Sequence, residues 1–373
     1  MPVRSPYRLD ADLGLLYYTM DSELPPLGAS IQRPWGFVVV EEVNGLPCTE
    51  FVGGSDGDRS VYLMVKEGVD HLTALRLVTR ALGKRVHVLG VKDANAVTYQ
   101  LVYVRGPPTL RELTLDRVRL RFVGMHRGSL RHTGNRFTIS LAVSDPSELS
   151  RRVSALAGIG LILNYFGYQR FGLRRPNNHL VGKAMVMGDL RGAVDLIVGR
   201  PFPGEPEAAR EFRSTYDSGD LEEALRRIPR RGYELERAVL REYLRTGDPS
   251  RALRASLVPP SFFVEAYQSY LFNLCLSALA EDGLPRPGSA IRVPTRASDA
   301  DETCRDVMRE EGVSVLYRPE LGVKVREMVR KAVASFTAPP RADCATLTFS
   351  LPRGSYATVV LREILRQDPL TLA

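Results

Sequence analysis

The chain has 373 residues, of which 44% are hydrophobic and 25% are charged, and its formal net charge is +8. This balance is typical of a soluble globular protein and argues against a disordered or membrane-spanning one, and the length predicts two or three domains with buried cores. No apolar stretch is long enough to cross a bilayer and the N-terminus lacks an apolar signal core, so we expect a cytoplasmic protein, or a nuclear one if the source is eukaryotic.

The first part of the chain alternates between irregular and regular segments. Residues 1–35 predict mostly irregular structure, whereas residues 35–42 are rich in aromatic and β-branched residues and predict a strand. A Gly- and Asp-rich loop separates this strand from another at 61–66. Residues 72–82 carry apolar side chains at helical spacing and stop at Gly83, so they predict a helix.

The next segment, residues 90–100, reads Gly-Val-Lys-Asp-Ala-Asn-Ala-Val-Thr-Tyr-Gln between two β-rich runs. Gly90 and Asn95 tolerate turn conformations, so the pattern predicts strand, loop and strand, with Asp93 near the end of the first strand. An ordinary hairpin, in which Lys92 and Asp93 only cap a turn, would have the same local pattern.

The remaining elements are predicted in the same way. They are a half-buried strand with a cationic outer face at 117–122, a turn and strand at 133–141, a buried helix at 149–166, charged helices over 182–250, a long apolar helix from 264, a loop at 284–295, and a strand, turn and helix start at 346–358. The cationic face could meet phosphate groups or could simply be solvated.

Six separated phrases resemble one known family. The spacing Gly90-x-Lys92-Asp93-x-x-Ala96-x-Thr98-x-Gln100 resembles the signature of the TruD family of RNA pseudouridine synthases, in its archaeal and eukaryotic-like branch. The other phrases are Phe-x-Val-x-Glu at 37–41, Gly-Asn-x-Phe at 134–137, Asn-Tyr-Phe-Gly-x-Gln-Arg-Phe-Gly at 164–172, Gln-Ser-Tyr-Leu-Phe-Asn at 268–273, and the strand and turn at 346–358. The resemblance therefore covers nearly the whole chain.

The resemblance implies roles for five residues. It implies that Asp93 is the catalytic nucleophile and that Phe37, Asn135, Phe137 and Tyr356 hold the target uridine. These residue types suit the task, because an amide offers a donor and an acceptor and an aromatic face stacks on a base. Each also has a structural alternative, namely core aromatics and an Asn in a turn.

The chain departs from the family pattern at the cation that accompanies the nucleophile. The family usually carries a Lys shortly before the strand at 35–42, and this chain has none there. Arg33 could supply the charge from a shifted position. Lys92 adjoins the nucleophile, but it would point to the other face if the strand continued that far. In the segment 164–172 we expect most residues to pack at a domain junction and Arg170 to contact RNA.

The resemblance also implies the fold class, which is α+β. It implies a pseudouridine synthase fold with a mixed, largely antiparallel sheet flanked by helices, plus an inserted α/β TRUD domain. The catalytic domain would be discontinuous, at 1–163 and 343–373, and the insert would span 164–342. We expect a monomer.

The implied activity is isomerisation of uridine to pseudouridine in tRNA, most often at position thirteen, without a cofactor. One carboxylate can serve, because a sugar that loses its base develops positive charge. Attack on the sugar, attack on the base and abstraction of a sugar proton all remain open. The alternatives are a non-catalytic RNA-binding or chaperone protein with the same fold, or a synthase for other RNAs. A carboxylate glycosidase, which would want two carboxylates, is a further alternative.

Cysteine and arginine usage bear on metals and partners. The four cysteines, Cys48, Cys275, Cys304 and Cys344, form no C-x-x-C, so we expect reduced thiols and no metal site. Six of the basic residues are lysine and 45 are arginine. The arginine excess fits phosphate recognition in tRNA, or equally a biased genomic base composition. We expect no membrane partner and no small-molecule cofactor.

Overall fold

The structure is a computed structural model that describes residues 2–172 and 175–372. Within these residues one sheet contains β1 (Ala29–Ile31), β2 (Phe37–Val43), β3 (Leu46–Pro47), β4 (Arg59–Glu67), β5 (His87–Val88), β6 (Val97–Arg105), β7 (Glu112–Leu115), β8 (Val118–His126), β9 (His132–Val143), β14 (Ala338–Asp343) and β15 (Thr346–Pro352). Its order is β14-β15-β9-β2-β6-β4-β8-β7, and β1, β3 and β5 pair with β9, β2 and β6. The β2–β6 pairing is parallel and the others are antiparallel, which confirms the predicted mixed sheet.

The helices lie mostly in the second half of the chain. They are α1 (Arg8–Asp12), α2 (His71–Leu82), α3 (Pro146–Ile159), α4 (Asn178–Met187), α5 (Leu190–Val198), α6 (Glu207–Asp217), α7 (Leu221–Arg227), α8 (Glu234–Thr246), α9 (Pro249–Arg254), α10 (Pro260–Ala280), α11 (Glu302–Glu310) and α12 (Ala357–Leu365). Two small ladders accompany them: β10 (Leu161–Leu163) pairs with β13 (Val333–Ser335), and β11 (Ala290–Val293) pairs with β12 (Met328–Lys331). No helix among the described residues is long and apolar enough to cross a membrane.

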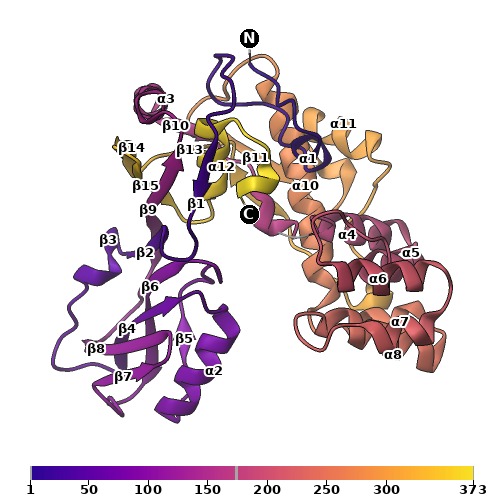
Figure 1. The fold of residues 1–373 in the computed structure, drawn as a ribbon, viewed down its shortest axis with the longest axis horizontal. Helices are drawn as coiled ribbons and strands as arrows, with labels where there is room; N and C mark the ends of the chain where they lie inside the picture. Colours follow the sequence, from indigo (N-terminus) through magenta and orange to yellow (C-terminus); the bar gives the residue numbers. More distant parts are fainter. Residues whose placement is uncertain (1, 173–174, 373) are drawn as a thin grey trace.

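Most of the sheet and most of the helices occupy opposite ends of the molecule. Figure 1 shows β4–β8 and α2 at one end and α4–α8 at the other, with α10, α12, β10 and β13 between them. The long apolar helix expected from residue 264 is present as α10, and the charged helices expected over 182–250 are α4 to α9. The predicted strand, turn and helix at the C-terminal end are β15 and α12. The boundaries of an inserted domain at 164 and 342 stay a prediction.

Local sequence signals explain where the helices near the sheet begin and end. The Asp70 side chain accepts a hydrogen bond from the Thr73 backbone N–H at the start of α2, and Gly83 ends this helix with φ +62°. Helix α3 has the same design, with Asp145 as its cap and Gly160 at φ +73°. Gly160 ends α3 seven residues before the predicted end, and β10 follows, so the predicted helix at 149–166 is wrong in its C-terminal third.

The N-terminal segment is held to α12 by a buried ion pair. Arg362, which is 1% exposed, donates from Nε to Asp10 Oδ2 at 2.7 Å and from Nη2 to the backbone carbonyl of Leu15 at 2.6 Å. The hydroxyl of Tyr168 donates to the other oxygen of Asp10 at 2.6 Å. Asp10 thus joins three distant segments: the N-terminal region, the residues that follow β10, and the last helix.

The cysteines correct one expectation. Cys275 in α10 and Cys304 in α11 form a disulfide with their Cα atoms 5.2 Å apart, whereas free thiols had been expected. The two residues are 29 positions apart in sequence and both are buried. Of the free cysteines, Cys48 is buried and Cys344 is exposed. The short motifs used to recognise paired cysteines from sequence do not cover a pair that two packed helices bring together.

Removal of this disulfide is expected to destabilise the protein. Cys304→Ser opens a closed loop of the chain, which should lower the free energy of unfolding by about 3 kcal/mol through the entropy of the unfolded state. Denaturant unfolding with and without reductant measures the effect, and Cys344→Ser is the matched control. Reductant should destabilise the unmodified chain and the control but leave Cys304→Ser unchanged. Equal stability of all three proteins under reducing and oxidising conditions would contradict this.

Candidate active site

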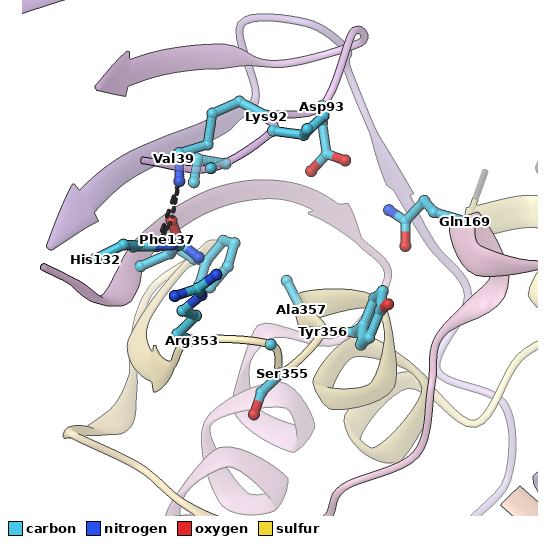
Figure 2. Close-up of a pocket in the computed structure, with 14 residues that line it drawn as sticks. Val39, Lys92, Asp93, His132, Phe137, Gln169, Arg353, Ser355, Tyr356 and Ala357 are labelled. Atoms are coloured by element: carbon cyan, nitrogen blue, oxygen red, sulfur yellow. Dashed lines mark hydrogen bonds between the residues drawn. The ribbon is translucent and has the colours of Figure 1, made fainter. Parts of the chain in front are cut away.

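One cavity collects most of the residues singled out in the sequence. It has a volume of about 300 Å³ and lies where β2 and β9 of the sheet meet the loop after β5, the turn before α12, and the 3₁₀ turn η2 (Tyr168–Arg170). Figure 2 shows Asp93 and Lys92 on one wall and Gln169, Tyr356 and Arg353 on the others. The lining residues are Val39, Gly90, Val91, Lys92, Asp93, His132, Asn135, Phe137, Gln169, Arg353, Gly354, Ser355, Tyr356 and Ala357.

Asp93 lies in the connection between β5 and β6 and is half-buried. The predicted hairpin is present, since His87 pairs with Tyr103 and Val88 with Val102. The first strand ends at Val88, however, so Asp93 belongs to the loop and not to the strand. Burial raises the pKa of the Asp93 carboxyl above its usual value, and the charges of nearby cations oppose that rise. A carboxylate in such surroundings is typical of a functional site.

Three cations act on Asp93, in the order Arg33, Lys66 and Lys92. Arg33 donates from Nη1 to the backbone carbonyl of Asn95 at 3.1 Å, and its guanidinium lies 4.3 Å from the ring centre of Phe37. Burial lowers the pKa of Arg33, while the charge of Asp93 raises it. Of the two residues proposed from sequence as the accompanying cation, Arg33 therefore exerts the stronger electrostatic effect.

The side chain of Lys92 binds Glu41 and Asn135. Its Nζ lies 2.8 Å from Glu41 Oε1 in a pair whose side chains are 3% and 0% exposed. The same ammonium donates to Asn135 Oδ1 at 2.8 Å and lies 3.4 Å from His132 Nε2. Glu41 is held in turn by the Leu101 backbone N–H, which donates to Oε2 at 3.1 Å. The loop is not a continued strand, so the alternation argument for the direction of Lys92 does not apply.

Sequence reasoning missed Lys66, although it lies under the loop that carries Asp93. Its side chain is fully buried in β4, and its Nζ donates to the backbone carbonyls of Val69, at 3.0 Å, and of Asp93. Burial lowers the pKa of Lys66 to about 8, opposed by the charge of Asp93. One signal was available: Lys66 is in phase with Tyr62 and Met64, so it shares a strand face with two core residues.

The proposed uridine-holding residues are placed differently from one another. Asn135 and Phe137 line the cavity from β9, as does Tyr356 from the turn before α12. Phe137 is only 4% exposed and its ring stacks on Phe349 with centroids 5.1 Å apart. Phe37 is fully buried and contacts Phe137 edge-on at 6.2 Å, so it supports the wall and does not line it.

Tyr356 is positioned by contacts from strand β12 and from the residue that follows strand β10. Arg330 donates from Nη1 to the Gly354 carbonyl at 2.7 Å and from Nη2 to Asn164 Oδ1 at 2.6 Å. Ser355 also donates to Asn164, at 3.0 Å. These bonds fix the turn that presents Tyr356 to the cavity. Burial raises the pKa of the Tyr356 hydroxyl above its usual value.

Among the lining residues that had not been proposed as site residues, His132, Gln169 and Arg353 have side chains with nitrogen atoms. Arg170, the expected RNA contact, is not among the lining residues. It donates from Nε to Ser269 at 3.1 Å and pairs with Glu265 at 3.4 Å, which suits a packed junction. No group of three or more His, Cys, Asp or Glu residues within 2–172 and 175–372 is arranged to hold a metal ion.

Comparisons with known proteins agree with this picture. The family model described as tRNA pseudouridine synthase D (TruD) matches residues 12–290 and 283–364. A protein named probable tRNA pseudouridine synthase D from Sulfurisphaera tokodaii is 38% identical over 96% of this chain and 99% of its own length. One of the same name from Saccharolobus solfataricus is 35% identical over 98% and 99%. A crystal structure from Methanosarcina mazei, described as TruD, matches with a TM-score of 0.71 and 26% identity over 97% of this chain and 98% of that one.

Proposed function

This chain belongs to the TruD family of tRNA pseudouridine synthases, and from that premise we propose that it isomerises uridine to pseudouridine in tRNA, with position thirteen as its target and Asp93 as its nucleophile. Pseudouridine synthases are isomerases, since the product has the same atoms as the substrate. The observation that carries the assignment of Asp93 is its carboxylate in a cavity, beside the cations Arg33 and Lys66. We propose that a monomer acts, in the cytoplasm and without a cofactor.

The residues suit this chemistry in distinct ways. The N1–C1′ bond must break while positive charge develops on the ribose, and a carboxylate stabilises or captures that charge. The target base must also leave its stack, which costs a few kcal/mol. Stacking on an aromatic face can offset this by about 1–3 kcal/mol, and Phe137 and Tyr356 border the cavity. Phe37 supports Phe137 from behind.

We also propose a division of labour between parts of the chain. Residues 1–163 and 343–373 would form the catalytic domain, because α12 and every strand of the large sheet except β14 fall there. Residues 164–342 would form an insert that closes over the RNA. Gln169 supports this, since it comes from that segment yet lines the cavity.

The direct test is conversion of an unmodified tRNA transcript by the purified protein. We expect one uridine, at position thirteen, to become pseudouridine, detected by chemical mapping of the whole transcript. A transcript with cytidine at that position should gain no pseudouridine. Binding without any conversion would favour the alternative of a non-catalytic RNA-binding protein, and conversion at another position or only in other RNAs would overturn the choice of target.

Asn135→Ala is expected to slow the chemical step more than it weakens tRNA binding. The reason is that phosphate contacts spread over a large surface carry most of the affinity, whereas Asn135 lies in the cavity. Loss of its hydrogen bond should lower the single-turnover rate about tenfold. Ser140→Ala, at an exposed position on the same strand, is the control. Weaker binding of tRNA with a normal single-turnover rate would mean that Asn135 does not contribute to the chemical step.

Phe137→Ala should also slow the chemical step more than it weakens tRNA binding. It should lower the stability of the protein as well, because the Phe137 ring packs in the core.

Binding of tRNA is expected to weaken steeply with salt. The chain carries a net charge of +8, and each phosphate that its arginines neutralise releases counterions from the RNA. Titrations at several salt concentrations should give a linear fall of log K against log salt. The control is Asp93→Asn, which should have the same slope because its proposed role places the carboxylate beside the ribose and not against a phosphate. A flat dependence would contradict electrostatic recognition of the RNA.

A further inference from the structure

The side-chain amide of Gln169 is anchored to helix α12 by one hydrogen bond. The hydroxyl of Thr358 donates to Gln169 Oε1 at 3.2 Å, and Thr358 itself is 2% exposed. Among the described residues, none accepts a hydrogen bond from Gln169 Nε2. Figure 2 shows the amide on the wall of the cavity that faces Asp93. In the structure the side chain therefore presents Nε2, a hydrogen-bond donor, to the cavity, while Oε1 accepts from Thr358.

The backbone around Gln169 is also fixed. The hydroxyl of Tyr168 donates to Asp10 Oδ1 at 2.6 Å, and Asp10 pairs with Arg362 of α12. On the other side, Arg170 donates to Ser269 Oγ of α10 at 3.1 Å. Because α12 also carries Thr358, the amide and the hydroxyl that orients it are mounted on elements that are tied to each other. Such preorganisation is what a binding residue requires.

Asn135 lines the cavity from strand β9, and its amide orientation is fixed by a charged group. Its Oδ1 accepts from Lys92 Nζ at 2.8 Å, and an ammonium group can only donate. Lys92 is itself fixed by the buried carboxylate of Glu41. The Asn135 amide therefore cannot turn over without losing a charged hydrogen bond, and Nδ2 is the atom left for a ligand. The cavity thus has two lining amides, and each offers a donor while its acceptor is occupied.

We propose that Gln169 and Asn135 form a donor pair that binds the two carbonyl groups of the target uracil, and that the same pair fits the base both before and after it turns. This rests on the function proposed above. In the isomerisation the N1–C1′ bond breaks, the C5–C1′ bond forms, C5 loses a proton and N1 gains one. Rotation about the axis through N3 and C6 exchanges N1 with C5 and also exchanges the two carbonyls.

This symmetry explains why donors on both sides are useful. An amide that presented its oxygen would repel a carbonyl in either orientation, whereas a fixed donor finds one in both. The detached base would then be held while it turns, with Asp93 beside the ribose. Gln169 is in this view a specificity-determining residue that contacts the base, and Thr358 is a positioning residue that acts through it.

The first test measures affinity in the Asp93→Asn background, in which no turnover occurs. Three RNAs of one tRNA sequence carry uridine, pseudouridine or cytidine at the modified position. Gln169→Ala is expected to weaken binding of the uridine and pseudouridine RNAs by the same factor, about three- to tenfold. A loss for only one of these two RNAs would overturn the claim that the donor fits both orientations. Gln169→Ala and Asn135→Ala could each weaken binding of all three RNAs equally, cytidine included. In that case neither side chain recognises a carbonyl specific to uracil, and the proposed donor pair is wrong.

A second test asks which carbonyl Gln169 meets. The target is replaced by 2-thiouridine or 4-thiouridine, because sulfur accepts hydrogen bonds weakly. We expect the loss caused by Gln169→Ala to disappear for one thio-RNA and to persist for the other, with Asn135→Ala showing the reverse pattern. Persistence of the full loss for both thio-RNAs would exclude a hydrogen bond from Gln169 to the base.

A third test addresses the orientation of the amide and uses a conservative control. Thr358→Val removes the hydroxyl that holds Gln169 Oε1, and it should narrow the difference in affinity between uridine and cytidine RNAs. Thr358→Ser keeps the hydroxyl and should leave that difference intact. Equal effects of both variants would mean that Thr358 contributes packing and does not orient Gln169.

The outcomes also separate the donor pair from the proposed function. If the unaltered protein makes no pseudouridine at all, the proposed function is wrong. If it converts uridine normally and Gln169→Ala has no effect on binding, only the donor pair is wrong.

Discussion

Asp93→Asn is expected to abolish conversion of uridine, lowering the single-turnover rate by at least about a thousandfold. The amide has the same shape as the carboxylate but carries no charge, so it can neither stabilise a ribose that loses its base nor act as a nucleophile. Folding should be preserved, because Lys66 donates to the backbone carbonyl of Asp93, which the substitution retains. Single-turnover assays with excess enzyme measure the rate without interference from product release.

Two comparisons make this result decisive. Asp58→Asn removes one exposed surface charge and should leave the rate unchanged. Affinity for tRNA should be equal in both variants, since the carboxylate is a small part of the RNA-binding surface. Near-normal turnover by Asp93→Asn would exclude Asp93 as the nucleophile, whatever the family of the protein.

Lys92→Met is expected to lower both the stability and the rate. Removal of one partner leaves the Glu41 carboxylate buried, with the Leu101 N–H as its one donor among the described residues, which should cost about 3–5 kcal/mol of unfolding free energy. Asn135 also loses the donor that fixes its amide, so we expect the single-turnover rate to fall by about tenfold or more. Denaturant unfolding and single-turnover kinetics give the two quantities separately.

A double variant separates these effects. Adding Glu41→Gln to Lys92→Met removes the unpaired charge and keeps an acceptor for Leu101, so stability should largely return. The rate should stay low, because the double variant still has no ammonium to orient Asn135. Recovery of both quantities together would mean that Lys92 serves only to neutralise Glu41 and does not shape the pocket.

Much of the fold was predictable from local patterns. The strands at 35–42 and 61–66, helix α2 with Gly83 at its end, and the hairpin around residues 90–100 depend on signals within a few positions of one another. The role of Asp93 was inferred from the sequence motif of its loop, which is also a local signal. The error at α3 had a visible cause, because the apolar run after Ile159 looked like more helix although Gly160 had already ended it.

The parts of the site that were missed depend on contacts between distant residues. Gln169 acquires its orientation from Thr358, 189 positions away, and no pattern near either residue shows this. From its sequence position, Lys66 resembles a polar residue at the end of a strand. Its role depends on the loop of Asp93, whose backbone carbonyl accepts a hydrogen bond from the Lys66 ammonium. The Cys275–Cys304 pair likewise needs two packed helices. Asn135 and Phe137 were brought to the cavity as predicted, but Phe37 supports the wall from behind.

The position of β15 in the sheet has a consequence for the order of assembly during synthesis. This strand is inserted between β14 and β9, although nearly the whole chain precedes it. While the ribosome is still adding residues 346–352, one edge of β9 has no partner and is open to pairing with other chains. Tyr356 and Thr358 arrive later still. A nascent chain therefore cannot complete the cavity or select a uridine until its last strand and helix emerge.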